Sequence, residues 1–301
     1  MKLATFRYQD RVCAGLVLAD GMLDLAAAAR LVGERLDLSS VLTIIQAGED
    51  GLAACRRLET AATQVKAAVL PESQVERLAP LPKLVRNAFC VGRNYADHVK
   101  EGATAMNREA KLPEAPQFFT KATHALVGPG AEVRLDARLT RRLDYEVELA
   151  VVIGRGGRDI TVENAYDHIF GYTIANDVTA RDLQRRHEQW FKGKSLDTTL
   201  PMGPVIVTRD EIPDPRTLEL TMSINGEERQ RARVSQMIFD IPTVIALLSA
   251  GLTLEPGDII ATGTPSGVGF AMTPPQYLHD GDEMLASIDK IGELRNRVVE
   301  V

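Results

Sequence analysis

The sequence has little cysteine, no basic block and no long hydrophobic run, and each shortage excludes a class of protein. Its three cysteines, Cys13, Cys55 and Cys90, lie far apart and form no C-x-x-C pair, which argues against a disulfide framework and a cysteine zinc site. The longest apolar stretch, residues 241–254, is shorter than the roughly 20 residues of a membrane helix. Early charged residues interrupt any signal peptide. We therefore expect a cytoplasmic protein without a membrane partner.

The charge balance and composition narrow the class further. The chain has 35 Lys and Arg against 41 Asp and Glu, a formal net charge of -6, and this balance does not favour nucleic acid as a partner. Hydrophobic residues make up 45% and charged residues 25%, as in ordinary globular proteins. A length of 301 residues predicts one large domain, or a small domain joined to a larger one.

A change in composition near residue 75 predicts two domains, 1–75 and 76–301. The first segment reads as two strands within residues 1–18, a turn at Gly21, and helices over 23–32 and about 51–69, the second stopped by Pro71. The proline-containing run 78–82 then precedes β-branched segments separated by glycine. We expect a small N-terminal α/β domain and a larger, mainly β domain.

The larger domain is predicted to be built from strands over 88–91, 145–153, 169–175, 205–208, 218–224 and 258–262. Asn225-Gly226 is the dipeptide typical of a tight hairpin turn. Asp240 as N-cap, followed by Pro242 and by Gly251 near the end, predicts one helix within the strands. The expected fold class is α+β, mainly β.

Two glutamates in a predicted strand, Glu146 and Glu148, form the most informative local pattern. Side chains alternate along a strand, so both carboxylates face one side, while Val147, Leu149 and Val151 face the other. Two close negative charges repel unless the site is solvated or neutralised, and hard oxygen ligands suit Mg²⁺, Mn²⁺ or Ca²⁺. An isolated E-x-E pair is more often the solvated face of a strand.

Asp177 is the candidate third ligand, because it ends an apolar strand where the chain turns into a polar segment. Taken alone, Asp177 would more often be a helix N-cap. His98 and Glu101 are three residues apart, which on a helix allows a general base and its orienting carboxylate. The alternative for that pair is an ordinary interaction on a surface helix, without a catalytic role.

Two further segments carry candidate polar groups. Lys192 and Lys194 lie in a glycine-containing segment, and a lysine near carboxylates can stabilise an oxyanion or a substrate carboxylate. Residues 261–269 form a glycine-rich loop that can present backbone N–H groups and the Thr264 hydroxyl to an anion. That loop lacks the lysine of a P-loop and the glycine order of a dinucleotide site.

Five motifs in sequence order carry a resemblance to a known family. They are Gly92-Arg-Asn-Tyr-Ala-Asp-His98 with Glu101, Asp144-Tyr-Glu-Val-Glu148, Asn176-Asp-Val-Thr-Ala-Arg-Asp182, Lys192-Gly-Lys-Ser195 and Thr262-Gly-Thr-Pro-Ser-Gly267. In this order they resemble the motifs of the fumarylacetoacetate hydrolase family, over roughly residues 85–301. One departure is Lys121-Ala-Thr123, where relatives often have a proline after the lysine.

The resemblance implies a fold, a metal site and an assembly. The catalytic domain would be a mixed β-sandwich roll with a small variable N-terminal domain, and the protein a homodimer. A divalent metal, Mg²⁺ with Mn²⁺ or Ca²⁺ as alternatives, would bind to Glu146, Glu148 and Asp177. The catalytic residues implied are His98, Glu101 and Lys194, and the substrate-binding residues implied are Arg181, Gln184 and Thr264.

The implied activity is cleavage of a carbon–carbon bond in a small 2-oxo acid of the acylpyruvate or fumarylpyruvate kind, in the breakdown of aromatic compounds. The metal would stabilise an enolate, and water activated by His98 would attack the acyl carbonyl. The same enolate serves an oxaloacetate decarboxylase, or an isomerase or hydratase of unsaturated 2-oxo diacids, and these stay alternatives. The dyad favours hydrolysis and argues against a non-catalytic binding protein. A lid is expected near residues 103–116, with its helix ending at Gly102.

Overall fold

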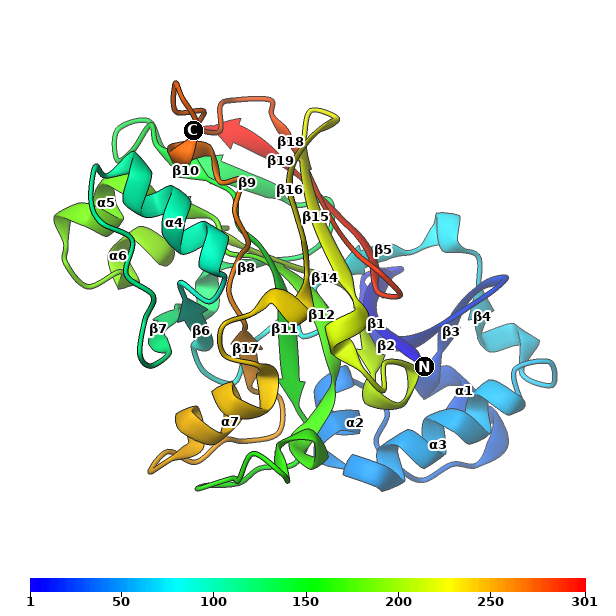
Figure 1. The fold of residues 1–301 in the computed structure, drawn as a ribbon. Helices are drawn as coiled ribbons and strands as arrows, with labels where there is room; N and C mark the ends of the chain where they lie inside the picture. The colour runs from blue at the N-terminus through cyan, green and yellow to red at the C-terminus, as the bar shows by residue number, and fades with distance from the viewer.

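The structure, a computed structural model, describes all residues 1–301, and two sheets form its framework (Figure 1). The main sheet has twelve strands: β1 (Lys2–Tyr8), β2 (Arg11–Leu18), β3 (Gly21–Asp24), β4 (Val69–Leu70), β5 (Glu76–Leu78), β6 (Ala88–Gly92), β7 (Gln117–Lys121), β8 (Leu126–Val127), β11 (Val147–Ile153), β12 (Ile169–Asn176), β14 (Leu200–Thr208) and β17 (Ile259–Ala261). Most neighbours are antiparallel, but β17 with β6 and β14 with β8 run parallel.

The second sheet has five strands: β9 (Glu132–Leu135), β15 (Glu219–Ile224), β16 (Glu227–Arg233), β18 (Glu283–Ile288) and β19 (Gly292–Glu300). A small third pair consists of β10 (Leu143–Asp144) and β13 (Thr179–Ala180). Alternate residues of β15 and β18 are buried, so each strand gives one apolar face to the core. The fold class is α+β, mainly β, as predicted.

Seven α-helices and eight short 3-10 helices complete the chain. The α-helices are α1 (Leu25–Val32), α2 (Val41–Gln46), α3 (Gly48–Thr60), α4 (Ala96–Ala105), α5 (Arg181–Arg186), α6 (Phe191–Lys194) and α7 (Ile241–Ser249). The 3-10 helices are η1 (Lys66–Ala68), η2 (Glu72–Gln74), η3 (Thr123–Ala125), η4 (Ala165–His168), η5 (Arg209–Glu211), η6 (Pro215–Thr217), η7 (Val234–Gln236) and η8 (Gly269–Ala271). No helix is both long enough and apolar enough to span a membrane.

The two faces of the main sheet bury different sets of side chains. One face packs against the five-stranded sheet and α7, where Val147, Leu149 and Met284 belong to one apolar cluster. The other face packs against α1, α2 and α3, where Ala150 and Val152 join a second cluster. Strand β11 is therefore buried on both sides, which is typical of a central strand with a continuous apolar sequence. Figure 1 shows the N-terminal helices on one side of the sheet and α4, α5 and α6 at another edge.

Local signals explain several elements. Asn225 and Gly226 have φ values of 52° and 82° and join β15 to β16, which confirms the predicted hairpin. The Asp240 side chain accepts a hydrogen bond of 3.0 Å from Thr243 N at the start of α7, which confirms the predicted cap. At the start of α1, Asp24 Oδ1 accepts from Ala27 N at 2.9 Å. The predicted helix over 23–32 therefore begins two residues later, because Leu23 belongs to β3.

The helix predicted over about 51–69 is wrong at both ends. It is α3, Gly48–Thr60, and Pro71 does not end it. Val69 and Leu70 instead pair with Leu23 and Met22 of β3, so a long-range strand pairing outweighs the local helical pattern. The short helix α2, capped by Ser40, was not predicted. The domain boundary near residue 75 stays a prediction; β1 pairs across it with both β5 and β14.

Candidate active site

Adjacent strands β11 and β12 bring three carboxylates together. Val147 of β11 pairs with Asn176 of β12, so Glu146, Glu148 and Asp177 lie at one end of this strand pair. One oxygen of each carboxylate lies within 4.8 Å of the others, and all three side chains are buried. The solvated strand face considered as an alternative is excluded by this burial. The predicted triad is a compact cluster of hard oxygen donors.

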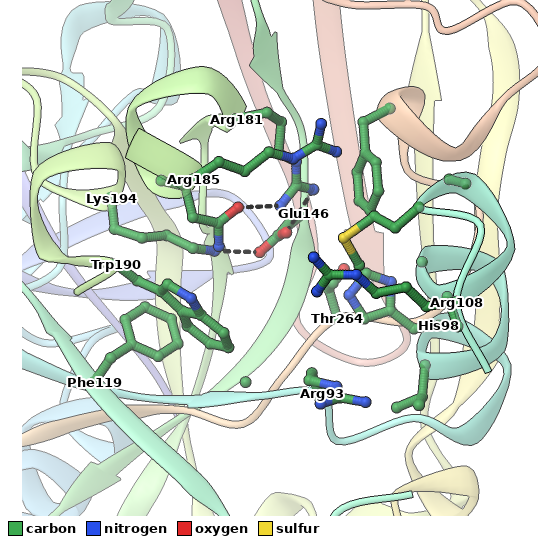
Figure 2. A pocket seen from close by; sticks show the side chains of 18 of the residues that line it. Arg93, His98, Arg108, Phe119, Glu146, Arg181, Arg185, Trp190, Lys194 and Thr264 are labelled. Carbon is green, nitrogen blue, oxygen red and sulfur yellow. Dashed lines mark hydrogen bonds and ion pairs between the residues drawn. The ribbon is translucent and has the colours of Figure 1, made fainter. Parts of the chain in front are cut away.

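Basic side chains neutralise part of the cluster. Lys194 Nζ donates to Glu146 Oε2 at 2.6 Å and to Asp177 Oδ2 at 2.5 Å, and Figure 2 shows the first of these contacts. Lys121 Nζ donates to Asp177 Oδ1 at 2.7 Å. Arg181 Nη2 lies 2.6 Å from Glu146 Oε1, an ion pair without good hydrogen-bond geometry. Burial disfavours each of these charges, and a close partner of opposite sign offsets part of that cost.

Glu148 has no such partner. Burial, reinforced by the charges of Asp177 and Glu146, raises the pKa of Glu148 well above its ordinary value, and its only hydrogen bond is from Gly263 N at 2.8 Å. Burial also works against ionisation of Glu146, but the charges of Arg181 and Lys194 hold the pKa of Glu146 well below its usual range. An unpartnered buried carboxylate beside two others fits a divalent cation, which favours oxygen ligands.

Lys194 stays protonated at neutral pH. Burial lowers the pKa of a lysine, but the charges of Asp177 and Glu146 outweigh it and raise the pKa of Lys194 above its ordinary value. Burial also lowers the pKa of Lys121, and there it prevails over the opposing charge of Asp177. Two ammonium groups in one cluster therefore experience opposite net shifts, because Lys194 bonds two carboxylates and Lys121 only one.

The helix α4 carries the predicted dyad. His98 Nδ1 lies 2.9 Å from Glu101 Oε1, and Glu101 Oε2 accepts from Gly267 N at 2.8 Å. The second bond ties the helix to the glycine-rich loop. Because a carboxylate accepts at Nδ1, that nitrogen holds the proton of a neutral ring and leaves Nε2 unprotonated. Figure 2 shows the His98 ring directed into the pocket.

A cavity of about 780 Å³ connects the triad with the dyad residue His98. Most of the predicted site residues line this cavity: His98, Glu146, Glu148, Arg181, Gln184, Lys194 and Thr264. Glu101 and Asp177 do not line the cavity, but they bond His98 and Lys194, which do. Trp190 and Phe119, 5.4 Å apart edge to face, form an apolar wall. Gly92 permits this wall, because a Cβ there would come within 2.3 Å of Trp190.

Three buried polar residues of the site were not predicted. Asp144 accepts from Arg181 Nε at 2.9 Å, from Gly269 N at 2.7 Å and from Phe270 N at 3.0 Å. Gln230 donates to Thr264 Oγ1 at 2.8 Å and accepts from Val147 N at 3.0 Å. Lys121 bonds Asp177, as described above. Asp144 opens the D-Y-E-V-E motif and Lys121 begins the Lys121-Ala-Thr123 segment compared with the family above, which were usable signals, whereas nothing near Gln230 in sequence points to the site.

The structure places the end of the helix before the expected lid later than predicted. Helix α4 does not end at Gly102 but continues to Ala105, because Gly102 keeps helical geometry and lies against Phe270, 3.5 Å from where a Cβ would be. The chain leaves the helix at Asn107, with φ of 50°. Residues 107–116 form no helix or strand, and Arg93 Nη2 fastens them by donating to Lys111 O at 2.8 Å.

Comparison with known proteins identifies the family. The model for the fumarylacetoacetate (FAA) hydrolase C-terminal region matches residues 87–299. The chain belongs to the fumarylacetoacetate hydrolase family. It is 46% identical to the oxaloacetate tautomerase YisK of Bacillus subtilis (strain 168) over 304 residues, 99% of this chain and 100% of that protein. It is 41% identical to a mitochondrial oxaloacetate tautomerase of Homo sapiens over 257 residues, 85% of this chain and 78% of that one.

Solved structures agree with this family. A fumarylacetoacetate hydrolase from the psychrophile Exiguobacterium antarcticum has a TM-score of 0.82 and 42% identity, covering 100% of both chains. A maleylpyruvate hydrolase from Sphingobium sp. SYK-6, in complex with manganese(II) and pyruvate, has a TM-score of 0.78 and 32% identity, covering 100% of this chain and 99% of that one. With its carboxylate triad, this chain is a metal-dependent enzyme of the family.

Proposed function

We propose that this chain is an oxaloacetate tautomerase, which interconverts the keto and enol forms of a small 2-oxo diacid. The observation that carries the proposal is one cavity lined by Glu146 and Glu148 of the buried carboxylate triad and by His98, which Glu101 orients. Relatives at 46% and 41% identity bear the name oxaloacetate tautomerase, which supports this reaction over the hydrolysis that the sequence favoured.

Tautomerisation moves one proton between C3 and the keto oxygen and breaks no carbon–carbon bond. His98 is suited to take the C3 proton and to return it to the keto oxygen, because Glu101 holds Nδ1–H and leaves Nε2 as a base that becomes an acid once protonated. Lys194 Nζ is suited to stabilise charge on the keto oxygen. A divalent cation on the triad would supply Lewis acidity to the oxygens of the oxo acid. Thr264 Oγ1 accepts from Gln230, so its own proton can be donated to the substrate.

The decay of enol-oxaloacetate, followed by its ultraviolet absorbance, tests the proposal. We expect the protein with Mg²⁺ to accelerate the decay, and chelation of the metal to remove the acceleration. Equal decay rates with and without protein would contradict the proposal. The spontaneous metal-catalysed reaction is the control.

A second candidate is the hydrolysis of acylpyruvates or fumarylpyruvate predicted from the sequence. The solved hydrolases of similar fold support it, and His98 could act on water instead of on C3. Decarboxylation of oxaloacetate needs the same stabilisation of charge on the keto oxygen and no attacking water. Release of pyruvate from acylpyruvates, or of carbon dioxide from oxaloacetate above the uncatalysed rate, would decide between them. The predicted homodimer is likewise a proposal, tested by sedimentation velocity.

A further inference from the structure

The outer part of the active-site cavity is lined by arginines without acidic partners. Arg93, Arg108 and Arg185 all line the cavity, and none of them takes part in an ion pair with a carboxylate. Some arginines elsewhere on the surface form such pairs, as Arg138 does with Asp136. Arg93, Arg108 and Arg185 differ from other unpaired arginines in lining the cavity. The contrast with the inner part is sharp, since Arg181 and Lys194 there are bonded to Glu146.

The charges of this outer part are unbalanced. Besides the three arginines it contains Lys111, and its only acidic side chains are Glu109 and Glu188. A concave surface with an excess of one sign concentrates ions of the opposite sign. An anionic group of the substrate would therefore be attracted to this part of the cavity, away from the carboxylate triad.

Arg93 is held in place by the fold. It lies between β6 and α4 with φ of 58°, a left-handed conformation that is unfavourable for a residue with a Cβ and is concentrated at functional sites. Its Nη2 donates to Lys111 O, and the other N–H groups of its guanidinium remain free. Arg108 follows α4 and has no hydrogen-bond partner for its side chain. Figure 2 shows both guanidinium groups on the His98 side of the pocket, across from Lys194.

We propose that Arg93 and Arg108 bind the second carboxylate of a dicarboxylic 2-oxo acid, whose oxo-acid end lies at the carboxylate triad. Guanidinium groups bind carboxylates through paired, charge-assisted hydrogen bonds. Arg93 is half-buried and Arg108 is exposed, so a substrate with an apolar arm would gain no ion pair from either residue and would desolvate Arg93 without a partner. The inference rests on the proposed function and adds to it the residues that select a diacid over a monoacid.

The test compares oxaloacetate with its 4-methyl ester, which has the same oxo-acid end but no second charge. We expect Arg93→Gln and Arg108→Gln each to lower kcat/KM for oxaloacetate by roughly 10-fold to 100-fold, mainly through KM, as for the loss of a hydrogen bond to a charged group. Turnover of the ester should change little. Arg186→Gln removes an equal charge from the same region but outside the cavity and should leave both substrates unaffected.

The outcomes separate the two proposals. If the wild-type protein turns over oxaloacetate but the variants keep its preference over the ester, the arginine inference is overturned and the tautomerase proposal stands. If there is no turnover, calorimetry of the Mg²⁺-loaded protein with 2-oxoglutarate and 2-oxobutyrate, which differ by one terminal carboxylate, tests the inference by itself. The arginine inference is supported if the wild type binds 2-oxoglutarate more tightly than 2-oxobutyrate and a protein carrying both Arg93→Gln and Arg108→Gln does not. It is overturned if the wild type binds the two acids equally.

Discussion

Glu148 differs from the other two carboxylates of the triad in having no basic partner. Basic side chains bond Glu146 and Asp177, whereas Glu148 accepts only from Gly263 N. A buried carboxylate without a counter-charge destabilises the folded protein. The charge that a bound cation must balance is therefore chiefly that of Glu148.

We predict that Glu148→Gln lowers Mg²⁺ affinity by more than about 10-fold, because the loss of a residue that merely orients a metal ligand already costs that much, while the protein stays folded. The glutamine retains the shape and removes a charge that the fold leaves unpaired. Calorimetry with Mg²⁺ and a thermal melt measure both effects. Glu188→Gln, in the outer cavity, is the matched control. Undiminished affinity would show that Glu148 is not a ligand.

Lys194 bonds two of the carboxylate oxygens that a cation would use. We predict that Lys194→Met binds Mg²⁺ more tightly than the wild type but has lower turnover, because a competing positive charge is removed together with the group that stabilises the keto oxygen. Calorimetry and enol decay test the two parts separately. As a control, Lys192→Met at the exposed neighbouring lysine should change neither Mg²⁺ affinity nor turnover. Weaker Mg²⁺ binding would contradict the competition.

His98 is assigned to proton transfer with the substrate and is not one of the three carboxylates proposed to bind the metal. We predict that His98→Asn reduces turnover by roughly 10²-fold to 10⁴-fold, the usual contribution of a positioned general base, with Mg²⁺ affinity little changed. Steady-state kinetics at saturating Mg²⁺, beside calorimetry, separate the two quantities. If metal affinity fell as steeply as turnover, His98 would be a ligand and the role given to the dyad would be wrong.

Spacing in the sequence predicted the Glu146–Glu148 pair and the dyad, because both depend on short intervals, whereas Asp177, far from them in sequence, was inferred from its place at the end of a predicted strand and from the family resemblance. Glu146 and Glu148 share a strand face, and one helical turn brings His98 to Glu101. The contacts of Lys121 and Gln230 could not be predicted, because they join residues 56 and 34 positions apart. Only the pairing of strands, which a single sequence does not reveal, places such side chains in the site.

Among the elements, those with capping or turn signals were predicted best. The hairpin at Asn225 and helix α7 have the expected bounds, since Asn-Gly and an Asp cap act locally. The strands at 145–153 and 258–262 were shorter than predicted, β11 beginning at Val147 and β17 spanning Ile259–Ala261. Residues 61–69 were wrongly assigned to the helix, which ends at Thr60; Val69 belongs to β4, which forms only by pairing with β3.

The Asp240 cap gives a prediction for helix α7. Asp240→Ala should lower the free energy of unfolding by about 1 kcal/mol, the usual value of an N-cap, because Thr243 N loses its acceptor. Asp240→Asn keeps an acceptor and should cost less. Chemical denaturation measures both variants. Enol decay should be unchanged, since α7 does not line the cavity. Equal stability of all three proteins would refute a capping role.

At the scale of the whole molecule, the N-terminal segment shares a core with the strands of the site. Leu3 and Leu16 belong to the same apolar cluster as Met202 and Ile206. Strand β1 also pairs with β14, Lys2 opposite Val207. Removal of the segment would expose both an apolar face and the edge of a central strand, which is a common cause of aggregation.

We predict that a chain of residues 76–301 alone gives little soluble protein or unfolds without a cooperative transition. Soluble yield and circular dichroism melts, compared with the full chain, measure this. Adding back residues 1–75 as a separate peptide is the complementing control. A soluble 76–301 chain with the melting temperature of the full protein would show that the N-terminal segment is an independent domain.

Asp144 holds two sides of the cavity with one carboxylate. It bonds Arg181 of α5 and the backbone of Gly269 and Phe270 in η8, and the Arg181 guanidinium lies 4.5 Å above the Phe270 ring. The helix α5 and the turn η8 therefore cannot separate without breaking charge-assisted bonds. The cavity can widen only where residues 107–116 border it, because this segment is joined to the rest of the protein mainly by the hydrogen bond from Arg93 to Lys111 O. We therefore expect substrate and product to enter and leave the cavity on the side of residues 107–116.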